Sequence, residues 1–368
     1  MTASDLISFA RGAPSLDIVD VDGLKAAADA ALTSDPGGAT GYGTAIGYPP
    51  LRKFLAEKHG VAEEQVLVTN GSMQADAFLF DELVTAGEPV VVERPTYDRT
   101  LLGLRQRGAD VRPVTLATDG IDTEELAALL ESGVRPTFAH VIPNFQNPAG
   151  YTLSAAKRAR LLELAEQHDF IVFEDDPYVQ IRFAGEPLPT MLELDNGRGR
   201  VVYASSFSKT VAPGVRVGYL VGPADLIAKI RVRATNTYIS PNMLAQAIVH
   251  RFVVDGGLER SVATVNAALR ERADVLCDAL AKHIPDATFT KPDGGYFMWV
   301  ELPDGVDVAA LLTASEERGA TFVKGTDFLL EGGRSSLRMA YSGVRTDQIV
   351  EGVTRIADAL ASLRVGAN

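Results

Sequence analysis

A lysine stands among serines in a loop between two apolar stretches of this chain. Residues 201–222 read V-V-Y-A-S-S-F-S-K-T-V-A-P-G-V-R-V-G-Y-L-V-G, so Lys209 lies in the loop and Arg216 follows seven residues later. The apolar, β-branched ends of the stretch are typical of buried strands. An amine held at a strand end can form a Schiff base, and hydroxyls with a guanidinium can surround a phosphate. A surface hairpin with a solvated lysine fits the loop equally well by itself, so residues elsewhere must decide.

Three adjacent carboxylates follow the apolar run 170–173, where the chain reads E-D-D-P-Y from Glu174 to Tyr178. Neighbouring carboxylates at the end of a buried strand repel one another and lose hydration. They are unfavourable there unless a cation or a hydrogen-bond donor lies nearby. We favour a functional interpretation at this strand end, because perturbed charges gather at functional sites.

Three further polar segments follow expected strands, and each is a weak signal alone. N-G-S-M-Q at 70–74 opens a helix whose free N–H groups suit a phosphate, although an ordinary helix cap has the same sequence. R-P-T-Y at 94–97 ends in Tyr97, which can stack on a flat ring or pack in the core. P-N-F-Q-N-P-A-G at 143–150 is a long turn with two asparagines, a residue that turns often contain.

Strands alternating with helices must position these segments. Apolar runs predict seven strands, at 65–69, 89–93, 111–114, 137–142, 170–173, 201–204 and 217–221. Helices are expected between most of them, which predicts an α/β fold with a mixed, mostly parallel sheet covered on both faces. Ligands of such sheets bind beyond the carboxyl ends of the strands, where the polar segments lie.

The pattern changes toward the C-terminus. We expect helix from Pro223 to about His283, with a break at Gly256-Gly257, and then shorter strands and helices. The domain prediction is therefore an N-terminal segment at 1–40 that packs with a small α+β domain at 284–368. Residues 41–283 are expected to form the large, cofactor-binding domain.

The composition excludes several classes of protein. The chain has 368 residues, 46% hydrophobic and 23% charged, with a net charge of −13, which disfavours binding to nucleic acid or an anionic membrane. There is one cysteine, and the five histidines have no metal-ligand spacing, so we expect neither an intramolecular disulfide nor a metal site. The first ten residues lack the pattern of a secretion signal, and no run can span a bilayer, so the expected location is the cytoplasm.

The segments N-G-S-M-Q, R-P-T-Y, P-N-F-Q-N-P-A-G, E-D-D-P-Y, S-S-F-S-K-T-V-A-P-G-V-R-V-G-Y and S-L-R-M-A-Y occur in one order along the chain. Together they resemble the fold type I pyridoxal-phosphate enzymes, in particular the class I/II aminotransferases. The lysine loop and the N-P-A-G turn are the most specific segments. The A-P-G-V-R-V-G-Y form and the opening I-S-F-A-R-G-A-P further resemble the branch that contains 2-aminoadipate and kynurenine aminotransferases.

The resemblance implies a role for each matching residue and a bound pyridoxal 5'-phosphate. Lys209 would hold the cofactor aldehyde as a Schiff base and later move the substrate proton. Asp175 would pair with the ring nitrogen, Tyr97 would stack on the ring, and these two with Lys209 form the expected catalytic set. Tyr178 and Asn147 would hydrogen-bond the ring hydroxyl.

The same resemblance implies the remaining binding residues. The cofactor phosphate would contact Gly71, Ser72, Met73, Ser206, Ser208 and Arg216. Arg338 would clamp the substrate α-carboxylate, helped by Asn147, and Gly12 would cover the substrate. Tyr42 matches a tyrosine that reaches the phosphate of a neighbouring subunit, which implies a homodimer with shared active sites.

One departure from the family pattern is Arg11, which stands where glycine is usual and could read an acidic substrate side chain or face water. The implied reaction moves an amino group from an L-amino acid to a 2-oxo acid. A lyase, racemase, decarboxylase or oxidase with the same cofactor is the alternative. A ligand-sensing domain of a transcription regulator is less expected, because only six residues precede Ile7 and the chain is acidic. The motifs do not select the amino donor or acceptor.

Overall fold

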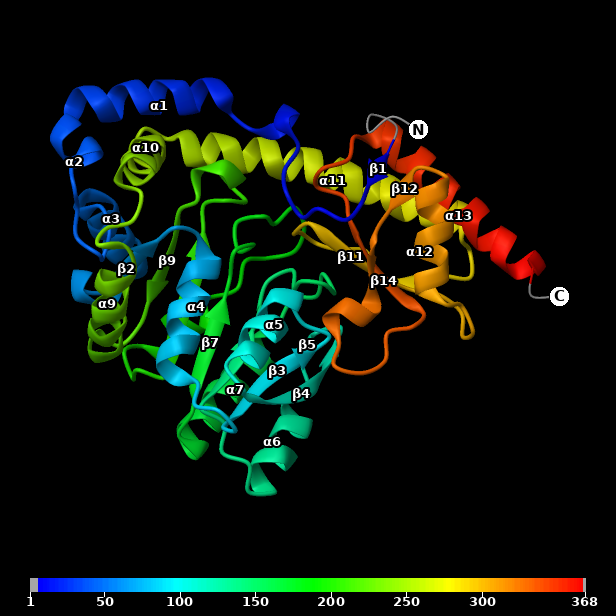
Figure 1. Ribbon diagram of the computed structural model, residues 1–368, viewed down its shortest axis with the longest axis horizontal. Coiled ribbons are helices and arrows are strands. Elements are labelled where there is room, and N and C mark those ends of the chain that lie inside the picture. Colours follow the sequence, from blue (N-terminus) through cyan, green and yellow to red (C-terminus); the bar gives the residue numbers. More distant parts are fainter. Residues whose placement is uncertain (1–5, 367–368) are drawn as a thin grey trace.

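A mixed, mostly parallel sheet forms the centre of the larger part of the molecule (Figure 1). The computed structural model describes residues 6–366. The strand order is β2 (Val66–Thr69), β9 (Gly218–Val221), β8 (Val201–Ser206), β7 (Ile171–Asp175), β6 (Phe138–Val141), β3 (Pro89–Arg94), β4 (Asp110–Ala117) and β5 (Gly120–Ile121). The strands from β8 to β4 run parallel, whereas β9 is antiparallel to β8 and to β2. The expected α/β class is confirmed.

This sheet has eight strands within residues 6–366, not the seven that the apolar runs predict. The additional strand, β5, has two residues and pairs antiparallel with the end of β4. Gly120 permits the sharp return, because its φ of 107° is a conformation that other residues rarely adopt. Two residues are too few to show the alternation that marks a strand, so the sequence pattern misses this one.

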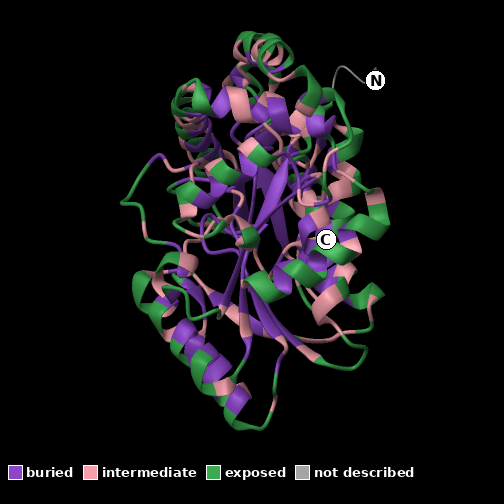
Figure 2. Ribbon diagram, turned by 90° about the vertical axis from the view of Figure 1, so that its left-hand side faces the viewer, coloured by how far each residue is buried: buried purple, intermediate pink, exposed green. Residues whose placement is uncertain are grey.

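Helices cover both faces of the large sheet. One face packs against α4 (Ser72–Leu83), α5 (Asp98–Gln106) and α9 (Ala224–Tyr238). The other face packs against α3 (Pro49–His59), α6 (Thr123–Glu131), α7 (Ala155–His168), α8 (Met191–Asp195) and α10 (Met243–Val254). Short 3-10 turns lie at Glu63–Gln65 and Pro213–Val215. Figure 2 shows the strands as a buried interior beneath helices whose outer sides are exposed.

A second, antiparallel sheet lies in the C-terminal part, in the order β10 (Thr288–Phe289), β11 (Phe297–Glu301), β14 (Ser336–Ala340) and β13 (Val323–Lys324). It packs with α12 (Val308–Glu317), α13 (Thr346–Gly366) and the long helix α11 (Gly257–His283). A 3-10 turn at Gly325–Phe328 precedes β14. Figure 1 shows α11 running from the large sheet toward this smaller one. The expected small α+β part is confirmed.

The N-terminal segment contacts both parts of the molecule. β1 (Ile7–Ser8) pairs in parallel with β12 (Ala320–Thr321), next to the smaller sheet. After a 3-10 turn at Leu16–Ile18, α1 (Val21–Ser34) packs instead along α10, and α2 (Pro36–Thr40) follows (Figure 1). The ends of the two expected terminal segments, 1–5 and 367–368, lie outside the described residues, as does half of the stretch read for a secretion signal.

No helix in the part of the chain that the structure describes is long and apolar enough to cross a membrane. The same residues contain no group of three or more histidine, cysteine, aspartate or glutamate side chains placed to hold a metal ion.

Candidate active site

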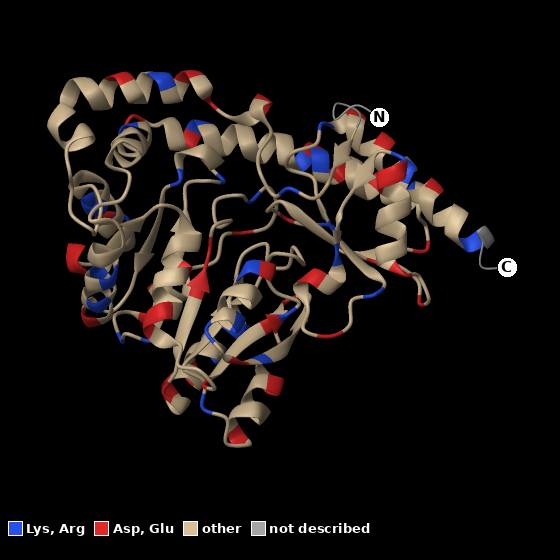
Figure 3. Ribbon diagram, viewed as in Figure 1, with Lys and Arg blue, Asp and Glu red and all other residues tan. Residues whose placement is uncertain are grey.

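Neighbouring strands bring the polar segments to one edge of the large sheet. Asp175 at the end of β7 lies opposite Ala204 of β8, which continues to Ser206 and the lysine loop. Gly218 at the start of β9 pairs with Ser206, so the loop returns to the same edge. The acidic end of β7 is visible as red ribbon near the middle of Figure 3. The parallel strands thus place their carboxyl ends together, as expected of a binding edge.

A cavity of about 140 Å³ opens at this edge. Its wall contains ten of the sequence-predicted cofactor residues: Ser72, Met73, Tyr97, Asn147, Asp175, Tyr178, Ser206, Ser208, Lys209 and Arg216. Asp76, Ile142, Pro177 and Pro213 complete the wall. Segments far apart in the sequence therefore meet around one space.

The three adjacent carboxylates at the end of β7 point to three different places. Glu174 accepts the backbone N–H groups of Met191 and Leu192 at 2.8 and 2.9 Å, so it caps α8, and burial raises its pKa to about 7. Asp176 is buried and accepts a hydrogen bond of 2.8 Å from the Asn144 amide. Only Asp175 faces the cavity.

Asp175 is held as a buried carboxylate with one oxygen unused. Its Oδ2 lies 3.6 Å from Nε2 of His140, a buried residue of β6. Its Oδ1 has no hydrogen-bond partner among residues 6–366. A buried carboxylate oxygen in this state calls for a donor, and a protonated ring nitrogen in the cavity would supply one.

Lys209 joins the lysine loop to the N-terminal segment. Its Nζ donates a hydrogen bond of 2.6 Å to the Gly12 carbonyl, and the Tyr296 hydroxyl donates to the Lys209 carbonyl at 2.7 Å. Burial and the charges of Arg338 and Arg216 lower the pKa of the Lys209 amine to about 8, although the Asp175 charge acts in the opposite direction. A neutral amine, the nucleophilic form, is therefore accessible near neutral pH.

Hydroxyls and a guanidinium converge beside the start of α4. The Ser206 hydroxyl lies 2.9 Å from that of Ser208, which accepts from Arg216 Nη1 at 3.3 Å. Gly71 precedes the helix with a φ of 89°, and a Cβ on it would lie 2.3 Å from Arg216 Nη2. The helix N-terminus and the arginine can therefore approach one anion together, because this glycine has no side chain.

A second cavity of about 380 Å³ adjoins the first and shares Tyr97, Asn147, Tyr178 and Lys209 with it. Arg338 lines this cavity, with its guanidinium carbon 4.4 and 4.8 Å from the ring centres of Phe297 and Phe328. Its Nη1 donates to Asn147 Oδ1 at 2.9 Å and its Nη2 to the Ala10 carbonyl at 2.6 Å. Its Nε is buried and has no partner in the described part of the chain.

Gly12 also lines the second cavity, and a Cβ on it would lie 2.4 Å from the Phe297 ring. Two other predicted residues lie elsewhere. Arg11 is exposed and lines neither cavity. Tyr42 is 92% exposed and borders a separate hollow formed with residues 240–244. These two side chains do not reach the Lys209 site of their own chain.

Sequence reasoning missed several residues of the site. Asp76 lies one turn inside α4 and lines the first cavity. His140 lies inside a buried strand, and the two phenylalanines beside Arg338 come from the smaller sheet and the turn before β14. The available signal was spacing, because Asp76 follows Ser72 by four residues and shares its helix face.

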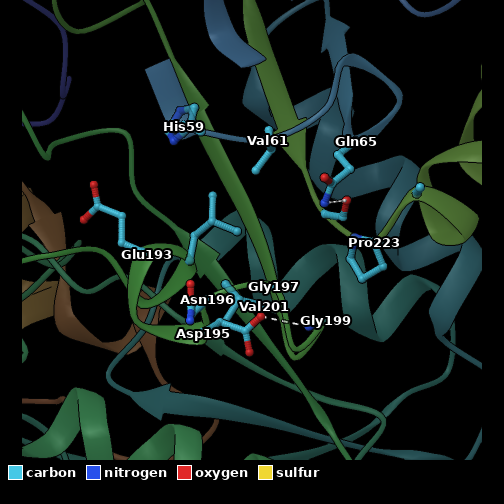
Figure 4. Close-up of a pocket in the computed structure, with 14 residues that line it drawn as sticks. His59, Val61, Gln65, Glu193, Asp195, Asn196, Gly197, Gly199, Val201 and Pro223 are labelled. Carbon is cyan, nitrogen blue, oxygen red and sulfur yellow. Dashed lines mark hydrogen bonds between the residues drawn. The ribbon is translucent and has the colours of Figure 1, made fainter. Parts of the chain in front are cut away.

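A larger cavity, of about 600 Å³, lies at the opposite edge of the sheet (Figure 4). Val201, the first residue of β8, lines it, whereas the last residue of that strand faces the Lys209 cavity. Asp195 in its wall accepts the Gly199 N–H at 2.8 Å, and burial lowers the pKa of His59 to about 3. Asp195 thus stabilises its own loop and the His59 imidazole is neutral, so neither group is poised for catalysis. We therefore assign the reaction to the edge of the sheet that contains Lys209.

The first cavity fits pyridoxal 5'-phosphate on the chemistry of its own wall. It offers an amine that can be neutral, an anion-binding end and a buried carboxylate oxygen that lacks a donor. Fold and site thus define a fold type I enzyme that uses pyridoxal 5'-phosphate. Residues 4–356 match the family model for aminotransferase class I and II, and the chain belongs to that family. It is a pyridoxal-phosphate-dependent aminotransferase, as the resemblance implied.

Relatives of known structure or activity agree. The chain is 34% identical to the 2-aminoadipate transaminase of Thermus thermophilus, across 97% of this chain and 91% of the relative. It is 32% identical to aromatic-amino-acid aminotransferase 1 of Thermococcus litoralis, across 97% and 88%. The structure of α-aminoadipate aminotransferase from Thermus thermophilus, complexed with N-(5'-phosphopyridoxyl)-L-leucine, has a TM-score of 0.94 at 32% identity, with 98% of this chain and 93% of that chain covered.

Proposed function

We propose that this aminotransferase moves the amino group of an L-amino acid to a 2-oxo acid, with Lys209 as the residue that first holds the cofactor and then carries the proton. The observation that carries this proposal is the position of the Lys209 amine in the wall shared by both cavities. One cavity contains Asp175 and the phosphate-type residues, and the other contains Arg338. The amine therefore stands between a cofactor and a substrate.

The residues divide the chemistry among them. When bound, pyridoxal phosphate supplies a carbon that takes up the amino group and a ring that accepts electrons from the substrate Cα. Lys209, whose amine has a pKa of about 8, would take the proton from the substrate Cα and return it to the cofactor carbon on the other side of the transferred nitrogen. Asp175 would pair with the ring nitrogen, and Tyr97, which lines both cavities, would cover the ring.

Binding roles follow from the same walls. Ser72, Met73, Ser206, Ser208 and Arg216 would hold the phosphate, with Gly71 leaving space for the arginine. Asn147 and Tyr178 would hydrogen-bond the ring hydroxyl.

The substrate binds in the second cavity. Arg338 would accept the α-carboxylate through a fork of N–H donors, and Asn147 keeps that fork oriented. Gly12 lies close enough to cover the substrate. The two relatives named above act on 2-aminoadipate and on aromatic amino acids, so these donors come first in a substrate panel. Arg11 remains a candidate to bind an acidic substrate side chain at the mouth of the site.

We further propose a homodimer in the cytoplasm, in which Tyr42 reaches the phosphate end of the partner's site. Its 92% exposure supports this, since the side chain is free to contact a second chain. The division into residues 1–40, 41–283 and 284–368 stays part of the proposal, with the long helix α11 joining the last two.

A donor panel with 2-oxoglutarate and pyruvate as acceptors tests the function. The purified protein should show the visible absorption of a lysine-bound pyridoxal phosphate, lose it on addition of the right amino acid, and recover it with the oxo acid. Lys209→Ala should abolish turnover. Turnover by that variant would contradict the assignment, and release of ammonia without an oxo-acid acceptor would favour a lyase or an oxidase instead.

A further inference from the structure

Asp76 is a buried carboxyl group in the cofactor cavity that the mechanism above does not use. It lies on α4, one turn after Ser72, so its side chain shares the helix face that borders the phosphate end. The residue is 8% exposed, and its Oδ1 has no hydrogen-bond partner in residues 6–366. A buried acid in this state needs an explanation, because an uncompensated buried charge is costly.

The surroundings of Asp76 favour its neutral form. Burial, and then the charge of Asp175, raise the pKa of Asp76 well above its usual range. Asp76 also lines a hollow of about 280 Å³ between α4 and α5, which Arg99 and Arg107 border. Those arginines already pair with other acids, Arg99 with Asp98 at 3.4 Å and Arg107 with Asp81 at 2.6 Å.

Lys209 and Arg216 line the same cavity, but Asp175 is the only charged group that shifts the pKa of Asp76, so no positive charge offsets an anion there. Tyr97, at the start of α5, has its pKa raised to about 12, with burial as the main cause and Asp76 among the smaller ones. His140 of β6 lies against Asp175, at 3.6 Å. Asp175 has this imidazole and the cofactor as partners, whereas Asp76 has neither. Of two carboxyl groups in one buried site, one keeps its proton, and here that group is Asp76.

We propose that Asp76 stays protonated and donates a hydrogen bond to Asp175, so that it sets how strongly Asp175 attracts the proton of the cofactor's ring nitrogen. Both carboxyl groups have an Oδ1 without a partner in the described chain, and both line the same cavity. The donated bond spreads the charge of Asp175 over more atoms and orients it. Asp76 is thus a positioning residue, and this role rests on the proposed function of Asp175.

Two substitutions at Asp76 separate the possible roles. Asp76→Asn keeps a hydrogen-bond donor, whereas Asp76→Leu removes it while keeping the same branching and number of side-chain heavy atoms. Asp29→Asn makes the same chemical change on the exposed side of α1, away from both cavities, and serves as the matched control. Each full-length holoenzyme is titrated from acid to alkaline pH while the absorption of bound pyridoxal phosphate is recorded.

We expect the midpoint of the absorption titration of Asp76→Asn to stay near that of the wild type and of Asp29→Asn. In Asp76→Leu the hydrogen bond to Asp175 is lost, so the charge of Asp175 is less dispersed. The midpoint of the absorption titration should therefore rise by about half a pH unit to one pH unit. Equal shifts in the Asn and Leu variants would mean that Asp76 is an anion, and no shift in either would mean that it is a bystander. Both outcomes overturn the proposal.

A second measurement needs no cofactor and so separates this proposal from the proposed function. A buried acid with a raised pKa contributes its full stability only below its unfolded pKa of about 4, and that contribution is lost as the pH rises. The cofactor-free Asp76→Asn chain should therefore melt about 2–4 °C above the wild type at mildly alkaline pH, with a smaller difference in acid. A difference that does not change with pH would contradict a protonated Asp76, whatever the enzyme catalyses.

Discussion

Arg338 is held more tightly than a simple positive charge requires. Aromatic rings lie 4.4 and 4.8 Å from its guanidinium carbon, and two of its nitrogens donate to Asn147 and to the Ala10 carbonyl. A lysine would keep the charge but lose the planar fork. Arg338→Lys should therefore lower kcat/KM for the amino acid about a hundredfold, the effect of losing one charge-assisted hydrogen bond of about 2–3 kcal/mol.

The absorption of bound cofactor should change little in Arg338→Lys, since the charge is kept and the phosphate contacts lie in the cavity that Arg338 does not line. Arg99→Lys is the matched control, because Arg99 lines the same cavity but pairs with Asp98. An equal loss in both variants would show that the effect is not specific to the fork of Arg338, and full activity in Arg338→Lys would show that positive charge alone is enough.

Lys209 should titrate in the range where the enzyme is assayed. Its pKa of about 8 reflects burial and the nearby charges of Arg338 and Arg216. Only the neutral amine attacks an aldehyde, so uptake of pyridoxal phosphate by cofactor-free protein should speed up with pH and level off above about pH 8. Removing the charge in Arg338→Gln should raise the pKa and move this midpoint to higher pH.

Stopped-flow absorbance at a series of pH values gives that midpoint directly. Arg260→Gln, on the outer side of α11, is the control for loss of one positive charge far from the site. A midpoint that is the same in Arg338→Gln and Arg260→Gln would mean that the arginine does not act on the lysine.

At the scale of elements, the residues that follow strands were the predictable ones. Asp175 and Lys209 could be placed in one site because the carboxyl ends of parallel strands meet at one edge. Asp76 could not be placed in the site from the sequence, because its position depends on how α4 is rotated against the sheet. The aromatic neighbours of Arg338 depend on packing between two parts of the chain, which local spacing does not encode.

In the helical region after Pro223, local sequence predicts only one of two helix breaks. The break predicted at Gly256-Gly257 lies at residues 255–256, and a second break at 239–242 separates α9 from α10. Ile239 there adopts a φ of 67°, and the Asn242 N–H bonds to Asn70 Oδ1 at 2.9 Å. That contact ties the break to the start of α4, and long-range contacts of this kind override local helix propensity.

The turn before α4 is an element whose conformation serves the site. Gly71 has a φ of 89°, and a Cβ would lie 2.3 Å from Arg216 Nη2. Gly71→Ala should strain the turn by about 1–3 kcal/mol and also push the arginine away, so the dissociation constant for pyridoxal phosphate should rise at least about tenfold. Gly87→Ala is the control, since Gly87 has a φ of 86° with open space around it.

Both glycine variants should lose stability in thermal unfolding of the cofactor-free protein, but only Gly71→Ala should bind the cofactor more weakly in a fluorescence titration. Weaker binding in both would trace the effect to backbone strain alone, and unchanged binding in Gly71→Ala would remove Arg216 from the phosphate site.

At the scale of the whole molecule, the two cavities meet at Lys209 because the N-terminal segment and the smaller sheet close over the edge of the large one. Gly12 accepts from Lys209, and Arg338 of β14 donates to Ala10 and Asn147. The proposed substrate binding at Arg338 is thus coupled to contacts between the two parts. The overall α/β arrangement was predictable from alternating strands and helices, whereas this closure was not, since it relies on hydrogen bonds between residues about 200 to 330 positions apart.

Tyr42 gives the last test, because its own chain offers it no place in the Lys209 cavity. If it completes the site of a partner, a Tyr42→Ala chain and a Lys209→Ala chain are each defective alone, yet a mixed dimer has one site with both residues intact. Equal mixing after reversible dissociation should then restore about a quarter of the wild-type activity, as random pairing of two chains in a symmetric dimer requires. A mixture no more active than its components would mean that Tyr42 serves its own chain or none. Mixing Tyr42→Ala with a Lys209→Ala/Tyr42→Ala double variant is the control, since no pairing of those chains contains a complete site.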